Sequence, residues 1–155
     1  MREYKTRAAQ VCSLLNAHNA KYVVVGATAL QLWGTTRATR DIDILIEATV
    51  PNGRRVLAAL GDLPLGIAKE WRPEELVKRP VTIMGDMPKV DILTVAWSVH
   101  YAEAARDARV FTVEGVDIPT ASIDHLIASK RTGRLQDAAD IEVLEEIKRL
   151  TASSR

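Results

Sequence analysis

Apolar and polar positions change period several times along the chain, and each period predicts a type of element. Residues 3–19 carry apolar side chains at helical spacing, which predicts an amphipathic helix. Residues 22–25 form an uninterrupted apolar run that Gly26 ends, as is typical of a strand buried on both faces. A short helix over residues 27–32 is expected to follow.

Residues 41–46 alternate strictly between two kinds of side chain, which predicts a strand with two different faces. One face carries three isoleucines. The other carries Asp41, Asp43 and Leu45. This second face therefore places two acids at the start of a strand, and it is the first candidate for chemistry.

The remaining pattern predicts two hairpins and several helices. The hairpins pair residues 81–84 with 89–94 and residues 110–113 with 116–118. Helices are predicted over residues 54–60 after a turn at 51–53, 74–78 after Pro73, 97–107, 122–132 and 136–150, with a frayed tail at 151–155. Gly133 is the expected stop between the last two helices.

These elements predict an α+β fold in which a mixed β-sheet is flanked by helices. We expect one domain over residues 1–155, with an N-terminal helix at 3–19, a sheet at 22–119 and a C-terminal helical pair at 122–150. The length of 155 residues is sufficient to bury a core.

Composition narrows the possible partners. The chain is 47% apolar and 26% charged, with a net charge of +1, so no general affinity for nucleic acid or membrane surfaces is expected. The single cysteine excludes an internal disulfide. The apolar runs are too short for a bilayer and the first residues do not suit a signal peptide, so we expect a cytoplasmic protein without a membrane partner.

The acids suggest a site for divalent cations. Residues two apart on a strand share a face, so Asp41 and Asp43 are expected to converge, and Asp91 in a second strand could supply a third carboxylate. Magnesium is usually held by one or two carboxylates together with substrate phosphates. In two-metal phosphoryl transfer one ion activates the attacking oxygen and the other stabilises the leaving group.

A phosphate site is expected beside these acids. Gly26 permits close approach of a ligand, and the helix that begins at Ala27 directs free amide groups at an anion. The glycine pattern of dinucleotide-binding folds and the phosphate loop ending in Gly-Lys-Ser/Thr are both absent. Trp33, Trp71 and Trp97 are too far apart to predict a stacking platform, although Trp33 and Trp97, which follow the segments of Gly26 and Asp91, could each touch a base.

Four ordered sequence blocks together span most of the chain. They are Gly-Ala-Thr-Ala from Gly26, Arg37-x-Thr39-Arg40-Asp41-Ile42-Asp43, Val90-Asp91-Ile92-Leu93, and Leu126-Ile127-Ala128-Ser129-Lys130 followed by Gly133-Arg134-x-x-Asp137-x-x-Asp140. These blocks resemble the nucleotidyltransferase superfamily, which has a polymerase-beta-like fold, and within it the AbiEii-type toxins and their small relatives.

The resemblance implies transfer of a nucleoside monophosphate from a nucleoside triphosphate such as ATP to an acceptor, with pyrophosphate release. It implies that Asp41, Asp43 and Asp91 are catalytic and hold Mg²⁺ or Mn²⁺. It also implies a set of nucleotide-binding residues: Gly26, Ala27, Thr28, Arg40, Lys130 with Arg134 or Arg131 nearby, and Asp137, which would orient the lysine. Ala27 departs from the Gly-Gly or Gly-Ser of many members, and Thr28 is the neighbouring hydroxyl.

The acceptor and the biological role stay open at this point. A tRNA or other RNA end, a protein side chain and a small molecule are all possible acceptors, and the AbiEii resemblance adds a toxin with a cognate antitoxin. One alternative is a nucleotidyltransferase-like module that binds without turnover, as an antitoxin or regulatory partner. Another is a magnesium-dependent phosphodiesterase or nuclease, because two-metal chemistry also serves hydrolysis.

Overall fold

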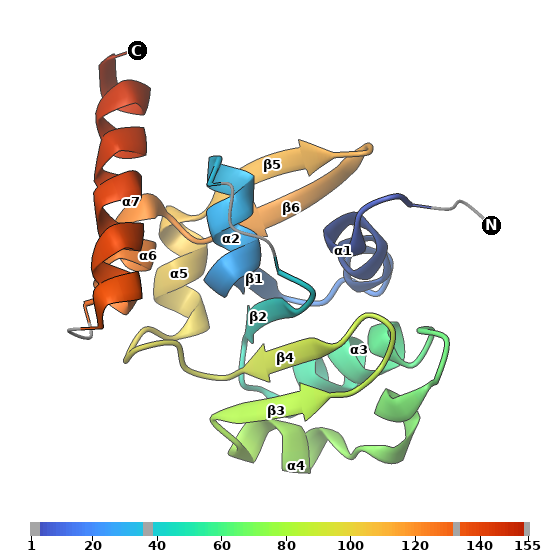
Figure 1. Ribbon diagram of the computed structural model, residues 1–155. Coiled ribbons are helices and arrows are strands. Elements are labelled where there is room, and N and C mark those ends of the chain that lie inside the picture. Colours follow the sequence, from blue (N-terminus) through green and yellow to red (C-terminus); the bar gives the residue numbers. More distant parts are fainter. Residues whose placement is uncertain (1–3, 36–38, 132–133, 154–155) are drawn as a thin grey trace.

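The computed structural model describes residues 4–35, 39–131 and 134–153 (Figure 1). Within these ranges lie seven α-helices, one 3-10 helix and six strands. The helices are α1 (Arg7–Ala17), α2 (Gly26–Trp33), α3 (Val50–Leu60), α4 (Pro73–Lys78), α5 (Tyr101–Asp107), α6 (Ile123–Ser129) and α7 (Leu135–Ser153), and the 3-10 helix is η1 (Ile67–Glu70). The strands are β1 (Tyr22–Val25), β2 (Ile42–Ile46), β3 (Val81–Met84), β4 (Val90–Leu93), β5 (Arg109–Val113) and β6 (Val116–Thr120).

The six strands form one mixed sheet in the order β3-β4-β2-β1-β6-β5. The pairs β3/β4 and β5/β6 are antiparallel, which confirms both predicted hairpins, and β1 and β2 are also antiparallel. In contrast, β2 runs parallel to β4 and β1 runs parallel to β6. The predicted mixed sheet flanked by helices is therefore confirmed.

The strand register divides the sheet into two faces with different roles. Val24 lies opposite Ile44 in the β1/β2 pair, so the isoleucines of β2 share a face with Tyr22 and Val24. The other face carries Asp43 and Leu45, and the register of β2 with β4 adds Asp91 to it. This arrangement confirms the predicted alternation within β2.

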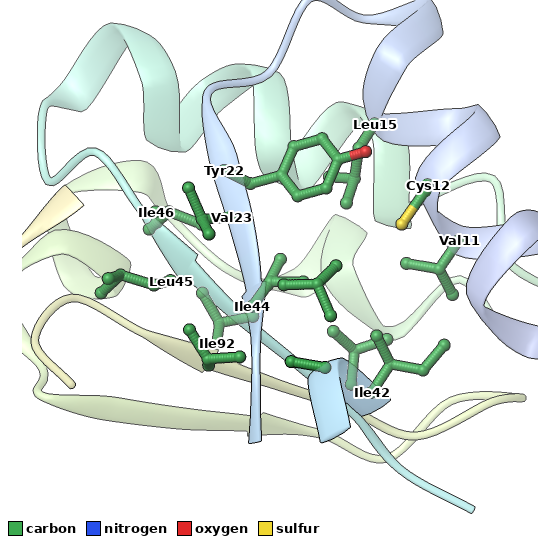
Figure 2. Packing of buried hydrophobic residues seen from close by; sticks show 14 of the residues in the cluster. Val11, Cys12, Leu15, Tyr22, Val23, Ile42, Ile44, Leu45, Ile46 and Ile92 are labelled. Carbon is green, nitrogen blue, oxygen red and sulfur yellow. The ribbon is translucent and has the colours of Figure 1, made fainter. Parts of the chain in front are cut away.

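The isoleucine face is buried beneath helices. Figure 2 shows Val11, Cys12 and Leu15 of α1 among the side chains that surround Tyr22 and Ile44. All five of these side chains are 3% exposed or less, and fully burying a large apolar side chain contributes about 1.5–3 kcal/mol. Burial raises the pKa of the Cys12 thiol to about 12, so this cysteine packs as an apolar residue.

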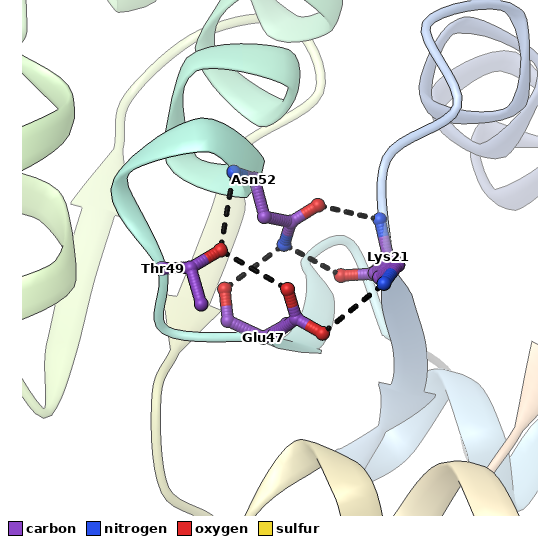
Figure 3. A network of polar contacts seen from close by, with 4 residues as sticks. All are labelled: Lys21, Glu47, Thr49 and Asn52. Atoms are coloured by element: carbon purple, nitrogen blue, oxygen red, sulfur yellow. Dashed lines mark hydrogen bonds and ion pairs between the residues drawn. The ribbon is translucent and has the colours of Figure 1, made fainter.

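A buried asparagine joins β1, β2 and α3 at one corner of the sheet (Figure 3). The side-chain oxygen of Asn52 accepts from the Lys21 backbone N–H at 2.7 Å, and its Nδ2 donates to the Lys21 and Glu47 carbonyls at 3.0 and 2.9 Å. Thr49 Oγ1 caps the helix by accepting from the Asn52 N–H at 3.3 Å. This corner corrects the predicted turn at 51–53: these residues form the first turn of α3, where proline is tolerated.

Other helix boundaries also differ from the predictions. The first helix begins at Arg7 rather than at residue 3, because Thr6 caps it, and it ends at Ala17. The predicted helix over 97–107 is wrong at its start: α5 begins at Tyr101, and Trp97 lies in a turn. Helix α7 continues to Ser153, so part of the predicted tail is helical. The expected stop at Gly133 lies outside the described residues.

The two C-terminal helices lie together beside the sheet, with α6 contacting both α7 and α2 (Figure 1). Helix α5 packs on β1. A cavity lies between these helices and the acidic face of the sheet, and residues of both line it. Among the described helices, none has the length and apolar character needed to cross a bilayer.

Candidate active site

Asp43 and Asp91 lie side by side on the acidic face of the sheet. They are direct neighbours in the parallel pairing of β2 with β4. Both line a cavity of about 240 Å³. The sheet thus brings together two acids that are 48 positions apart in the sequence.

The two acids in this cavity interact with each other. Burial, together with a hydrogen bond to Asp91 and the charges of Asp91 and Asp41, raises the pKa of Asp43 to about 7, while Lys89 opposes the rise. Asp91 Oδ1 is buried and accepts no hydrogen bond from the described residues, and the Lys89 ammonium lies 3.8 Å from it. A buried carboxylate oxygen without a hydrogen-bond donor is costly unless a cation offsets its charge, so this oxygen is suited to a cation.

Gly26 lies directly against the Asp43 carboxylate. Its φ angle is +65°, and a Cβ atom at this position would lie 2.1 Å from Asp43 Oδ2. Gly26 is also the first residue of α2 and lines the cavity. The free amide groups of the first turn of this helix are therefore available to an anion bound beside the acids.

Asp41 is linked to this pair through a lysine. Asp41 precedes the first residue of β2, and its Oδ2 accepts from Lys89 Nζ at 3.1 Å. The same Nζ lies 3.8 Å from Asp91 Oδ1. The lysine ammonium therefore bridges Asp41 and Asp91, two of the three acids that the sequence predicted to hold metal ions.

Four of the predicted nucleotide-binding residues do not line the cavity of Asp43, namely Ala27, Thr28, Arg40 and Asp137. The Thr28 hydroxyl donates to the Asp41 carbonyl at 3.0 Å, which fixes the segment leading into β2. Arg40 and Thr28 line a separate hollow beside α1, together with Asp41. Ala27 follows Gly26 in α2 and is half-buried outside the cavity lining. Arg37 of the sequence motif lies outside the described residues.

Basic residues from the end of α6 and the start of α7 line the same cavity as Asp43. Lys130 Nζ lies 3.5 Å from Asp137 Oδ1 and 3.3 Å from Asp140 Oδ2. Arg134 Nε donates to the other oxygen of Asp137 at 2.7 Å. The Arg134 side chain is 72% exposed, whereas that of Asp137 is only 3% exposed. Lys130 and Arg134 therefore line the cavity, and Asp137, which does not line it, contacts both of them.

The structure adds two residues to the site that the sequence interpretation left out. Lys89 is two positions before Asp91, so strand alternation could have placed it near the acids. His125 lines the cavity, and its Nδ1 is buried without a hydrogen-bond partner among the described residues. His125 is four residues before Ser129, so both lie on one side of α6. This spacing was a possible signal in the sequence that His125 belongs to the site.

The residues fit a magnesium ion held in part by substrate. Within the described ranges, no group of three or more His, Cys, Asp and Glu side chains is arranged to hold a metal. Magnesium, however, is commonly bound by one or two carboxylates plus phosphate oxygens. Asp43 and Asp91 supply such a pair, because they lie opposite each other in the register of β2 with β4 and Asp91 Oδ1 accepts no hydrogen bond within the described ranges.

Comparison with known proteins identifies a shared fold. No protein-family description and no curated protein matches the chain. A crystal structure of a proposed nucleotidyltransferase from Thermotoga maritima matches with a TM-score of 0.52 and 13% sequence identity, covering 93% of this chain and 89% of that one. The chain therefore has a nucleotidyltransferase-like α+β fold.

Proposed function

We propose that the protein is a metal-dependent nucleotidyltransferase that moves a nucleoside monophosphate from a nucleoside triphosphate to a hydroxyl or amine acceptor. One observation carries the proposal: a single cavity is bordered by Asp43 and Asp91, by Gly26 at the start of α2, and by Lys130 with Arg134. Acids for a metal, helix amides for an anion and bases for phosphate are the groups that this transfer requires. The shared fold supports the same class of reaction.

In the proposed reaction, the acceptor oxygen or nitrogen forms a bond to the α-phosphorus as the bond to the bridging oxygen toward the β-phosphorus breaks. Pyrophosphate leaves with that electron pair, and the acceptor proton passes to solvent. Asp43 and Asp91 would hold Mg²⁺ or Mn²⁺, which would neutralise phosphate charge and polarise the reacting oxygen atoms. Lys130 and Arg134 would bind the phosphates, and Asp137 would keep both bases in place.

A third ligand, Asp41, is proposed to join only when Lys89 leaves its carboxylate. The Lys89 ammonium balances Asp41 and Asp91 as long as no divalent cation is bound, because it lies within 4 Å of both. A divalent ion carries twice its charge and binds carboxylate oxygens directly. Lys89 would then be free to face substrate phosphates.

Release of pyrophosphate tests this function. The purified protein is incubated with Mg²⁺, each α-labelled nucleoside triphosphate and total cell lysate, and we expect label to pass to an RNA end, a protein or a small molecule. Asp43→Asn and Asp91→Asn should each lower the rate of label transfer and of pyrophosphate release at least about 100-fold, as loss of a central electrostatic group does. Asp62→Asn is the matched control, because Asp62 lies outside the cavity and pairs with His18. Unchanged turnover in Asp43→Asn would contradict the proposal.

The Lys89 contacts favour a second candidate, a nucleotide-binding module without turnover. If Lys89 remains on Asp41 and Asp91, it replaces the catalytic ion rather than yielding to it. This candidate predicts calorimetric binding of a nucleoside triphosphate with no pyrophosphate release from any lysate. Release that depends on Asp43 excludes it.

The relation to AbiEii-type toxins remains a proposal that growth experiments can test. Induced expression should arrest a bacterial host if the protein is such a toxin, and Asp43→Asn should restore growth. Co-expression of a neighbouring gene that encodes a cognate antitoxin should also restore it. Growth unaffected by the active wild-type enzyme would separate the enzymatic function from a toxin role.

A further inference from the structure

Trp97 is an exposed aromatic side chain at the border of the candidate active site. It lines the cavity that contains Asp43 and Asp91, yet it is 60% exposed. Trp33, by contrast, donates its indole N–H to the Ala121 carbonyl at 2.8 Å and packs edge-on against Phe111. A tryptophan is normally buried over most of its surface, so the exposure of Trp97 indicates that a bound ligand covers its ring.

The backbone of Trp97 is also strained. Ala96 and Val99 exchange two backbone hydrogen bonds of 2.9 Å each, which leaves Trp97 and Ser98 as the central residues of a two-residue turn. Their φ angles are +52° and +66°. Positive φ at both positions is the pattern of a type I′ turn, in which asparagine and glycine are the favoured residues. The fold therefore holds a bulky aromatic residue where a small one would be more stable, and such strain gathers at functional sites.

The neighbours of Trp97 in the cavity divide it into an apolar and an ionic part. Along β2 and β4 the acidic pair Asp43–Asp91 is followed two residues later by the apolar pair Leu45–Leu93, and Leu93 pairs in turn with Val81. Trp97 follows β4 at this apolar end, in the turn between Ala96 and Val99, which also line the cavity. A nucleoside triphosphate has the same division, with a flat base at one end and charged phosphates at the other.

We propose that Trp97 stacks against the base of the nucleoside triphosphate whose phosphates the ionic part of the cavity binds. This inference rests on the proposed nucleotidyltransferase function. Stacking on an aromatic ring uses the π face that every base has, and the adjacent lining is apolar, so Trp97 contributes affinity for a base without selecting one by hydrogen bonds. The larger purine rings gain more from it than pyrimidines.

Binding of ATP and of inorganic triphosphate, each with Mg²⁺, separates the base from the phosphates. Calorimetry on the full chain compares the wild type with Trp97→Asn and Trp97→Phe. Trp97→Asn should weaken ATP binding about 5- to 100-fold, the range for loss of one stacked base, and leave triphosphate binding within about twofold. Trp97→Phe should retain most of the ATP affinity. Lys130→Met should weaken both ligands.

Thermal unfolding of the same variants shows that the effect comes from the ligand contact. Asparagine tolerates positive φ, so Trp97→Asn should unfold at the wild-type temperature or above it while losing ATP affinity. Leu65→Asn is the matched control, because Leu65 is 57% exposed and lies outside the cavity lining. It should leave ATP binding unchanged.

The outcomes separate this inference from the function on which it rests. Unchanged ATP affinity in Trp97→Asn, or equal loss of ATP and triphosphate binding, overturns stacking on Trp97 while pyrophosphate release still supports the enzyme. A wild-type protein that binds neither ligand and releases no pyrophosphate overturns both. A selective loss of ATP affinity in Trp97→Asn, with Leu65→Asn unaffected, supports the stacking contact.

Discussion

Gly26 determines how closely the backbone approaches the acids. Gly26→Ala should be strongly destabilising, because alanine at positive φ costs about 1–2 kcal/mol and its Cβ would overlap Asp43 Oδ2, adding about 1–3 kcal/mol for overpacking. Gly66→Ala is a matched control, since Gly66 has a similar φ of +63° and an added Cβ there would lie no closer than 3.6 Å to a neighbouring atom. Urea unfolding should show the larger loss for Gly26→Ala. Equal losses would contradict a close approach to Asp43.

Asp43 should make the metal-free protein less stable as pH rises. Its pKa of about 7 in the folded chain is above the ordinary 3.8, so the folded state holds a proton that the unfolded state has lost between these values. Stability from this group is therefore greatest at low pH and decreases as pH rises through 7. In EDTA, Asp43→Asn should raise the melting temperature by several degrees at pH 8, and the gain should shrink toward pH 4. A gain that grows at low pH would contradict the shift.

Lys89 should compete with divalent cations for the carboxylates. In Lys89→Met the ammonium no longer contacts Asp41 or Asp91, so we expect a lower melting temperature in EDTA at pH 8 and several-fold tighter Mn²⁺ binding by calorimetry. Lys21→Met is the matched control, because Lys21 pairs with Glu47 at 3.4 Å away from the cavity. Weaker Mn²⁺ binding in Lys89→Met would show that the lysine supports the metal rather than replacing it.

At the scale of elements, the buried corner at Asn52 fixes α3 against the sheet. Asn52→Ala removes three hydrogen bonds to the Lys21 and Glu47 backbone and leaves those groups unpaired. We expect a loss of about 2–4 kcal/mol, at about 0.5–1.5 kcal/mol for each bond, measured by urea unfolding. Thr49→Ala removes only the cap and should cost about 1 kcal/mol. Similar losses in the two variants would contradict a central role for Asn52.

At the scale of the whole molecule, the cavity depends on how α6 and α7 meet the sheet. Asp137 pairs with both Lys130 and Arg134, so Asp137→Asn should weaken ATP binding about 3- to 30-fold by calorimetry while leaving Mn²⁺ binding at Asp43 unchanged. Glu142→Gln, at an exposed position of α7, is the control. Equal loss of ATP and Mn²⁺ binding would indicate general disruption instead.

Most elements could be predicted from the sequence because their signals are local. Alternation fixes the two faces of β2, and the short connections at 85–89 and 114–115 indicate the hairpins. Trp97 to His100 were misassigned to a helix because their residue types do not reveal a turn with positive φ, for which asparagine or glycine is the usual signal. Pro51 was read as a turn because the capping contact of Thr49 depends on the folded chain.

The sequence by itself determined which residues are acids on strands and where glycine permits close approach. These features follow from residue type and period. Only the tertiary structure decided that β2 and β4 run parallel with Asp43 opposite Asp91, and that Lys89 bridges Asp41 and Asp91. Strand order and register depend on packing between distant segments, so no local pattern contains them.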